Sequence, residues 1–275
     1  MKIIFDFGAN KGQNIEYFLK HADLVVSVEA NPRLCELINT RYQTEILEGR
    51  LIVENIALSD NKSSDRFVDF YINKRSHVNS TLDKPVNLEK FDKIRVFSKT
   101  PSSLIHHYLR QGGVAHYVKI DLEGYDVIAL NDLFCNHIYP DFISAEYQTI
   151  EVFAALILCG KYKAFKMGDL IKESIIHDYD PKNHNSDTQS SGRYGNDLPG
   201  DWLNADTFFH YFALTGKKGV DIHASRLDLP TELINRKYLP KDTRFLLVTL
   251  RNHLYRNIST NLYKQAKRLL RLLKR

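Results

Sequence analysis

The segment Ile3-Ile-Phe-Asp-Phe-Gly-Ala-Asn-Lys-Gly12 decides the fold of this 275-residue chain. Its apolar start predicts a buried strand over Ile3–Phe7, and the residues after it predict a helix over 12–21. A strand that turns into a helix within a few residues needs glycines, because they adopt positive φ and let the backbone approach a ligand. Gly8 and Gly12 meet that need, so we expect a ligand-binding turn here.

Strand and helix signals alternate beyond this turn. Leu24–Val28 and Leu51–Leu58 are expected strands, and Pro32 begins a helix, where its missing N–H is not needed. A hairpin is expected within 67–100, from Phe67–Ile72 and Ile94–Phe97. Further strands are expected over 117–122, 142–147, 163–167 and 245–250, and helices over 126–134, 150–159 and 206–214. This order predicts an α/β fold, Rossmann-like, with a mostly parallel sheet and helices on both faces.

Composition indicates a globular protein of the cytoplasm. Hydrophobic residues make up 43% and charged residues 26%, which is an ordinary globular balance. No apolar run reaches the ~18–20 residues of a membrane span, and the acid at Asp6 argues against a secretory signal. Cys35, Cys135 and Cys159 lack C-x-x-C spacing, which argues against a disulfide scaffold or a zinc knuckle.

The positive charge of the chain is concentrated in its last 25 residues. Residues 251–275 contain eight basic and no acidic side chains, which leaves 30 basic against 33 acidic in 1–250. We therefore divide the chain into a domain over 1–250 and a basic amphipathic tail over 251–275, expected to form a C-terminal helix. Residues 254–275 either contact the inner face of a membrane, dock on the domain or pack against a second subunit. We expect no nucleic-acid partner, because no aromatic platform accompanies these basic residues.

Acidic residues recur where the expected strands end. Glu29 ends the second strand, 21 residues after Gly8, close to the ~20-residue offset at which a carboxylate binds ribose hydroxyls. The other acids at strand ends are Asp6, Asp121, Glu123 and Glu146. Such a rim repels a pyrophosphate and favours a cationic cofactor, so we expect S-adenosylmethionine and not NAD. The alternative is a tight turn and a solvated strand end with no ligand.

Four motifs occur in order along the chain. They are Asp6–Gly12, Val28-Glu-Ala-Asn-Pro32, Ala57-Leu-Ser-Asp60 and Val118-Lys-Ile-Asp-Leu-Glu-Gly124. As a set they resemble the FkbM family of S-adenosylmethionine-dependent methyltransferases over roughly residues 3–170, although Ala30 replaces a proline of the family pattern. The resemblance implies a class I methyltransferase fold and O-methyl transfer to hydroxyls, typically of sugars or polyketide-type products.

The resemblance also implies roles for the motif residues. The methionine part of the cofactor would lie against Asp6, Gly8, Asn10 and Gly12, the ribose on Glu29, the adenine near Ala57 and Leu58, and the sulfonium near Asp121. Lys119 and Asp121 are catalytic candidates. Lys119 alternatively pairs with a neighbouring carboxylate, and Glu123 either serves the site or caps the helix after Gly124.

A later part of the chain is similar to a subset of that family. The matching segments are Ser190–Gly195, Trp202 and Asp221–Ala224, with Arg193 and Tyr194 in place of a proline and a phenylalanine. We expect residues 177–224 to shape an acceptor site that Asp221 contacts. Tyr194 and Trp202 either stack on a sugar ring or pack a loop against the sheet.

Methyl transfer to an alcohol needs a base that removes the hydroxyl proton. His223 is our candidate, because imidazole titrates near neutral pH; His77, His106 and His107 are weaker candidates. Asp121 and Glu146 end successive strands and could supply oxygen ligands to Mg²⁺. They more simply bind cofactor or acceptor, and we do not predict a metal.

The sequence thus predicts an S-adenosylmethionine-dependent O-methyltransferase. Its acceptor would be a sugar hydroxyl in a polysaccharide, glycolipid or nucleotide-sugar precursor. The alternatives are an NAD-linked oxidoreductase and a non-catalytic cofactor-binding scaffold attached to membrane by its tail. The sequence is compatible with a dimer and does not fix the oligomeric state.

Overall fold

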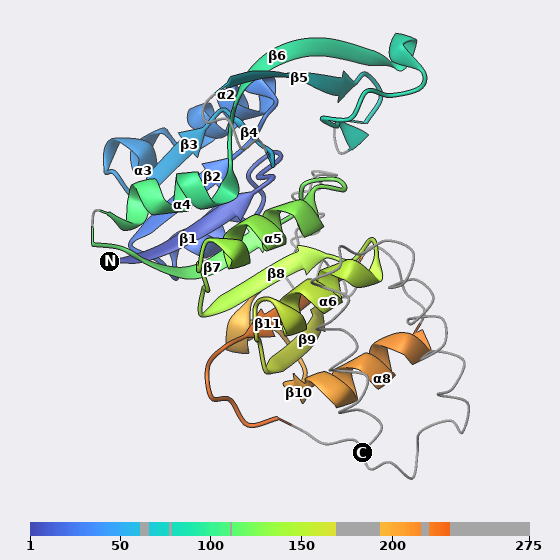
Figure 1. Ribbon diagram of the computed structural model, residues 1–275. Coiled ribbons are helices and arrows are strands. Elements are labelled where there is room, and N and C mark those ends of the chain that lie inside the picture. The colour runs from blue at the N-terminus through green and yellow to red at the C-terminus, as the bar shows by residue number, and fades with distance from the viewer. Residues whose placement is uncertain (61–65, 77–78, 111, 169–192, 216–219, 232–275) are drawn as a thin grey trace, which may run out of the picture.

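A computed structural model describes residues 1–60, 66–76, 79–110, 112–168, 193–215 and 220–231. Its centre is an eight-stranded sheet with the order β10-β9-β11-β8-β7-β1-β2-β3 (Figure 1). The strands are β1 (Lys2–Phe7), β2 (Leu24–Val28), β3 (Leu51–Glu54), β7 (Val114–Ile120), β8 (Phe142–Glu146), β9 (Ala164–Gly168), β10 (Leu203–Asn204) and β11 (Asp221–Ser225). Strands β3, β2, β1, β7 and β8 are mutually parallel, whereas β11 lies antiparallel between β8 and β9. This is the strand order of the Rossmann-like class I methyltransferase fold, so the predicted fold class is confirmed.

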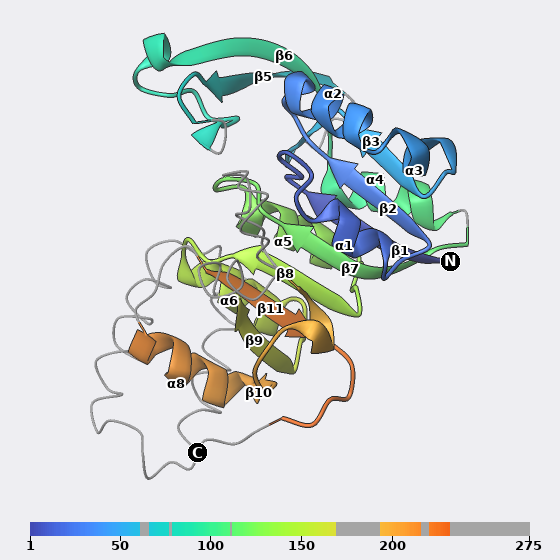
Figure 2. The same cartoon turned by 180° about the vertical axis from the view of Figure 1, so that it is seen from behind.

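Helices cover both faces of the sheet, as expected. One face packs against α4 (Pro101–Leu109), α5 (Asp126–Cys135), α6 (Ile150–Leu158) and α8 (Ala205–Thr215), in the larger apolar core. The other face packs against α1 (Ile15–Leu19), α2 (Pro32–Arg41) and residues 193–202, as the view from behind shows (Figure 2). A short α3 (Gln43–Leu47) follows α2. Because both faces are covered, β1 and β2 are almost continuously apolar.

Local signals set the start of α2. The Asn31 side chain accepts a hydrogen bond from the Arg33 N–H, and Pro32 occupies the first helical position. The predicted helix over 12–21 is shorter, because the Gly12 N–H bonds to the Ala9 carbonyl and forms a turn before α1 begins.

The predicted strand Leu51–Leu58 is wrong, because it is two strands in two sheets. The Asn55 amide donates to the carbonyls of Glu29 and Ala30, and the chain turns there. After the turn, β4 (Ala57–Leu58) joins β5 (Arg66–Asn73) and β6 (Phe91–Lys99) in a separate three-stranded sheet, with a short 3-10 turn η2 (Leu88–Lys90) before β6.

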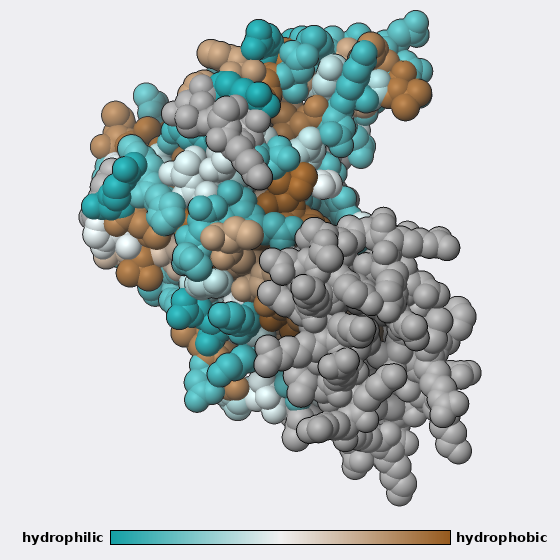
Figure 3. Space-filling model, viewed as in Figure 1, coloured by the Kyte–Doolittle hydropathy of each residue, from teal (hydrophilic) through white to brown (hydrophobic). Residues whose placement is uncertain are grey.

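The predicted hairpin is confirmed by the antiparallel pairing of β5 with β6. We call its described residues, 66–76 and 79–99, the arm. The arm extends from the β2–β3 side of the molecule and overhangs the edge of the sheet (Figure 1). The hydropathy surface shows the hollow between the arm and the domain below it (Figure 3).

The part of the chain after residue 113 is described only in part. Strands β7, β8 and β9 and helices α5, α6 and α8 lie where strands and helices were expected, whereas β11 was not predicted as a strand. The loop up to residue 192, the strand over 245–250, the tail over 251–275 and His77 lie outside the described residues. Within the described ranges, no helix combines the length and the hydropathy that a membrane span requires.

Candidate active site

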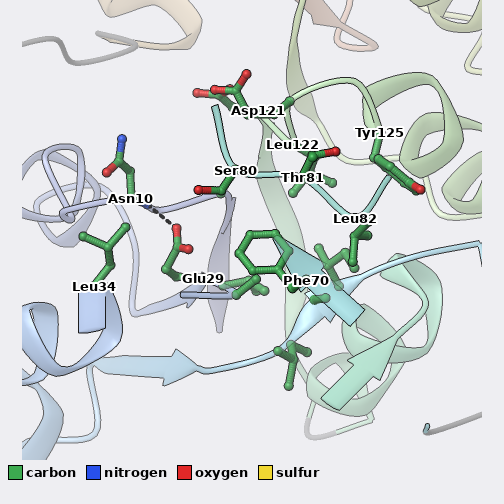
Figure 4. A pocket seen from close by; sticks show the side chains of 17 residues that line it. Asn10, Glu29, Leu34, Phe70, Ser80, Thr81, Leu82, Asp121, Leu122 and Tyr125 are labelled. Carbon is green, nitrogen blue, oxygen red and sulfur yellow. Dashed lines mark hydrogen bonds between the residues drawn. The ribbon is translucent and has the colours of Figure 1, made fainter. Parts of the chain in front are cut away.

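A pocket lies at the carboxyl ends of β1, β2 and β7, where open α/β sheets bind ligands. It encloses about 670 Å³ of space not filled by protein atoms, including the open space at its mouth. The sheet ends form its floor and the arm forms its far wall (Figure 4). Its lining is Gly8, Asn10, Val28, Glu29, Ala30, Leu34, Ile56, Ala57, Leu58, Phe70, Ser80, Thr81, Leu82, Asp121, Leu122, Glu123 and Tyr125.

The glycine turn after β1 is shaped by a close backbone contact. Gly8 has a φ of +80°, and a Cβ there would lie 1.9 Å from the backbone oxygen of Asp121. Only glycine fits this position, where the ends of β1 and β7 meet. Asn10 also has a positive φ, of +53°. Gly12 does not line the pocket, since a Cβ there would meet Ile15; its contact with a cofactor stays a prediction.

Glu29 is held in a fixed orientation at the end of β2. Its Oε2 accepts a hydrogen bond from the Asn10 N–H and its Oε1 one from the Asn31 N–H, both at 2.8 Å. Burial raises the pKa of Glu29 to about 7, although both hydrogen bonds lower it. Each oxygen keeps a lone pair, so the ionised carboxylate can accept two further donors, as a pair of ribose hydroxyls requires.

Lys119 lies beneath the pocket between two acids. Its Nζ lies 3.2 Å from Asp121 Oδ2 and 3.6 Å from Asp6 Oδ1, and it donates to the Gly8 carbonyl at 3.4 Å. Burial lowers the pKa of Lys119, but Asp121, Asp6 and Asp221 outweigh it and raise that pKa above its ordinary value. Lys119 therefore stays an ammonium that pairs with carboxylates, and it cannot serve as a base.

Asp6 lies in the buried sheet behind the pocket and does not line it. Neither of its carboxylate oxygens has a hydrogen-bond partner among the described residues. Burial, more than the repulsion from Asp121, raises its pKa, and Lys119 opposes this shift. Direct contact between Asp6 and a cofactor therefore stays a prediction.

The rim of the pocket carries several acids. Burial, followed by repulsion from neighbouring carboxylates, raises the pKa of Glu123 to about 8 and that of Asp126 to about 7, and it also raises that of Glu146. Glu123 does not cap the following helix, because the Gly124 N–H bonds to Asp126 Oδ2. None of the described residues that line the pocket is basic, and three of them, Glu29, Asp121 and Glu123, are acids.

Whether Asp121 and Glu146 bind a metal ion stays untested by the structure. Within the described ranges, no group of three or more His, Cys, Asp or Glu side chains is placed to hold a metal ion. Glu146 Oε2 instead accepts a hydrogen bond from the Gln148 amide at 2.8 Å.

Tyr194 and Trp202 are only 6% exposed. The Tyr194 ring stacks on Tyr117 at 4.1 Å between ring centroids and 7° between planes. Trp202 packs against Phe142 at 6.1 Å, and its Nε1 donates to Asn196 Oδ1. Of the two interpretations, packing of a loop against the sheet describes this structure, and neither ring is available to stack on a sugar.

His223 lies at the centre of β11, paired in register with Ser144 on β8 and Lys166 on β9. Its side chain is 1% exposed, and neither ring nitrogen has a hydrogen-bond partner among the described residues. Burial, assisted by Lys166, lowers its pKa to about 3. The imidazole is therefore neutral and outside the pocket lining.

Asp221 shares this burial, and burial raises its pKa well above the ordinary value. It does not line the pocket. The weaker base candidates His106 and His107 lie on α4, with exposed side chains, and are not part of the pocket lining either.

Sequence reasoning missed the residues that the arm adds to the pocket. They are Phe70, Ser80, Thr81 and Leu82, and Leu82 lies on the same side of the cavity as Tyr125 (Figure 4). The hairpin itself was predicted, but nothing local to it indicates the surface that it covers.

Comparisons with known proteins give fold-level likenesses. No protein-family model and no curated protein matches the chain. Among solved structures, M. capricolum TrmK in complex with S-adenosyl-homocysteine is 8% identical, covers 98% of this chain and 88% of its own, and has a TM-score of 0.37. The plantazolicin methyltransferase BamL, in complex with a triazolic desmethylPZN analogue and SAH, is 10% identical with a TM-score of 0.30, over 82% of this chain and 77% of its own. Both TM-scores lie below 0.5, so the fold assignment depends on the strand order and not on these likenesses.

Proposed function

We propose that this protein is an S-adenosylmethionine-dependent methyltransferase that methylates a sugar hydroxyl. The observation that carries the proposal is the oriented Glu29 carboxylate in a pocket with three acids and, among its described lining, no base. A ribose needs paired acceptors, and a sulfonium with an α-ammonium needs negative charge.

The residues present fit such a cofactor. Asn10 Oδ1 is a buried acceptor without a hydrogen-bond partner among the described residues, and an ammonium group would satisfy it. Gly8 lines the pocket where the ends of β1 and β7 meet, and Glu29 would hold the ribose. Ala57, Leu58 and Phe70 supply an apolar wall for an adenine ring.

The same pocket disfavours the NAD-linked alternative. A pyrophosphate needs cations or a helix N-terminus with free N–H groups. The described lining offers Glu29, Asp121 and Glu123 in that place and no basic side chain, so it supplies no group that would hold a phosphate.

The acceptor is proposed from the chemistry of the rim and from the FkbM resemblance. Carboxylates at the mouth, Asp121 and Glu123, accept hydrogen bonds from the hydroxyls that a sugar presents in number. We place this sugar in a polysaccharide, glycolipid or nucleotide-sugar precursor. The bound cofactor would supply an electrophilic methyl group on sulfur; the chain's own residues must align the acceptor oxygen with it and remove the hydroxyl proton.

We propose Glu123 ahead of His223 as the base. Glu123 lines the pocket, and its pKa of about 8 suits proton transfer near neutral pH. His223 is buried away from the lining, and a pKa of about 3 makes it a weak proton acceptor.

Calorimetry on the full chain tests the cofactor. We expect S-adenosylhomocysteine to bind and NAD not to bind. Glu29→Gln should weaken S-adenosylhomocysteine binding at least about tenfold, because it removes the charge from paired hydrogen bonds. Glu36→Gln, on the exposed side of α2, is the matched control and should bind as the parent does. Binding of NAD, or full affinity in Glu29→Gln, would refute the assignment.

Mass spectrometry tests the reaction. The protein, S-adenosylmethionine and a panel of nucleotide-sugars and oligosaccharides should yield a product heavier by one methyl group. If the methyl instead appears only on amines, the cofactor assignment stands and the sugar proposal fails.

A further inference from the structure

A hydrogen bond joins the arm to the domain at one edge of the pocket. The Tyr125 hydroxyl, just before α5, donates to Asp83 Oδ1 of the arm at 2.8 Å. Tyr125 lines the pocket, and so does Leu82, the neighbour of Asp83. Figure 4 shows Tyr125 and Leu82 on the same side of the cavity, opposite Asn10.

The arm segment that carries Asp83 is fixed to β5. Thr81 and Tyr71 exchange two backbone hydrogen bonds, of 2.9 and 3.0 Å. The Ser80 hydroxyl accepts from the Asn73 N–H, and the Thr81 hydroxyl accepts from the Asp83 N–H. Residues 80–83 are therefore attached to β5. Residues 80–82 line the pocket together with Phe70, so a hydrogen bond at Asp83 holds this wall in place.

We infer that Tyr125 and Asp83 form a strap that holds the arm over the nucleoside end of the pocket, so that both are positioning residues for the cofactor. The inference rests on the proposed function. A ligand that lies between the sheet ends and the arm leaves more easily when the arm moves away from the domain, and the strap opposes that movement. Its loss should mainly speed dissociation, since the floor of the pocket, with Glu29, is unchanged.

The size of the effect follows from the kind of bond. The hydrogen bond is solvent-exposed, so its net contribution is that of a typical single bond, and we expect about a threefold to tenfold change in the dissociation rate. Asp83→Asn keeps an oxygen acceptor and should retain most of the parent's behaviour.

Stopped-flow measurement of S-adenosylhomocysteine dissociation from the full chain tests the strap. Tyr125→Phe and Asp83→Ala should each dissociate faster, Asp83→Asn should rescue, and the double variant Tyr125→Phe/Asp83→Ala should be no faster than either single variant. The matched control is Asp69→Ala, which breaks the exposed 2.8 Å pair with Lys93 between β5 and β6 of the same arm. It should dissociate as the parent does.

The outcomes separate the strap from the proposed function. If the parent binds S-adenosylhomocysteine and all the strap variants dissociate at its rate, or if Asp69→Ala is equally fast, the strap is refuted and the proposed function stands. If the parent binds no S-adenosylhomocysteine, both fail. Equal thermal midpoints of the unliganded variants are expected, because a strap across a surface pocket adds little to folding; a clear drop would assign the bond to stability instead.

Discussion

The two halves of the sheet, β1–β2–β7 and β8–β11–β9, carry similar polar residues in different surroundings. At the ends of β1, β2 and β7, carboxylates face a cavity, and backbone N–H groups hold Glu29 in place. At β8, β11 and β9, His223 and Asp221 are buried outside that cavity and keep polar atoms without a hydrogen-bond partner among the described residues. A polar residue thus serves a site when it has both an orienting contact and an opening to solvent.

The two halves are joined by a row of polar side chains across the buried sheet. In register on six neighbouring strands stand Ser27, Asp6, Lys119, Ser144, His223 and Lys166. A buried polar group without a partner costs about 1–3 kcal/mol. On β9 the cost is reduced, because Lys166 Nζ donates to the Leu198 carbonyl at 2.8 Å. On β1 it is reduced by the ion pair between Asp6 Oδ1 and Lys119 Nζ at 3.6 Å.

Among substitutions at the ends of β1, β2 and β7, Gly8→Ala should have the largest effect. The new Cβ would overlap the Asp121 backbone oxygen at 1.9 Å, and φ is +80°, so we expect a loss of about 3 kcal/mol or more of unfolding free energy and no detectable cofactor binding. Gly49→Ala is the control, with a φ of +70° and nothing within 4 Å; it should cost only about 1–2 kcal/mol. Urea unfolding measures both, and equal losses would mean that the contact with β7 is unimportant.

A second test compares the two candidate bases, Glu123 in the pocket lining and His223 in β11. Glu123→Gln should lower kcat by about 10²–10⁴-fold with little change in S-adenosylhomocysteine affinity, whereas His223→Gln should change kcat much less. Steady-state kinetics with the acceptor found by mass spectrometry provides the measurement. The reverse pattern would return the role of base to His223 and place the acceptor at β11.

The pH dependence of cofactor binding tests the role of Glu29 at the end of β2. Glu29, with a pKa of about 7, accepts ribose hydroxyls best when ionised. Affinity for S-adenosylhomocysteine should therefore rise with pH up to about 7, up to about tenfold per unit in the steep region, and level off above. Calorimetry from pH 5.5 to 8.5 measures this profile. Glu29→Gln should flatten it, and a parent profile without this rise would contradict the role of Glu29.

The last test concerns stability without ligand. Burial raises the pKa values of Glu29 and Asp126 to about 7 in the folded protein, above their ordinary values near 4. Between those values the folded state binds more protons than the unfolded state, so stability is present at low pH and is lost as pH rises through about 7. The thermal midpoint should be lower at pH 8 than at pH 5.5. Glu29→Gln/Asp126→Asn should reduce that difference, and an unchanged difference would exclude these two groups as its source.

Prediction from the sequence succeeded where the cause is local. The turn at Gly8, the start of α2 at Asn31 and Pro32, and the place of Glu29 at the end of β2 follow from φ preferences, capping and the alternation of strand and helix. It failed at residues 51–58, where the Asn55 amide binds two carbonyls from another part of the chain.

By itself, then, the sequence determined the parallel sheet, its glycine turn and the carboxylate beside it, because each depends on neighbours within a few residues. The tertiary structure decided that β11 lies between β8 and β9, which buries His223, and that Tyr194 stacks on Tyr117 and not on a ligand. It also decided that the arm covers the pocket. These outcomes depend on which segments, far apart in the sequence, pack together and exclude water. Neither hydrophobic periodicity nor motif spacing encodes that directly.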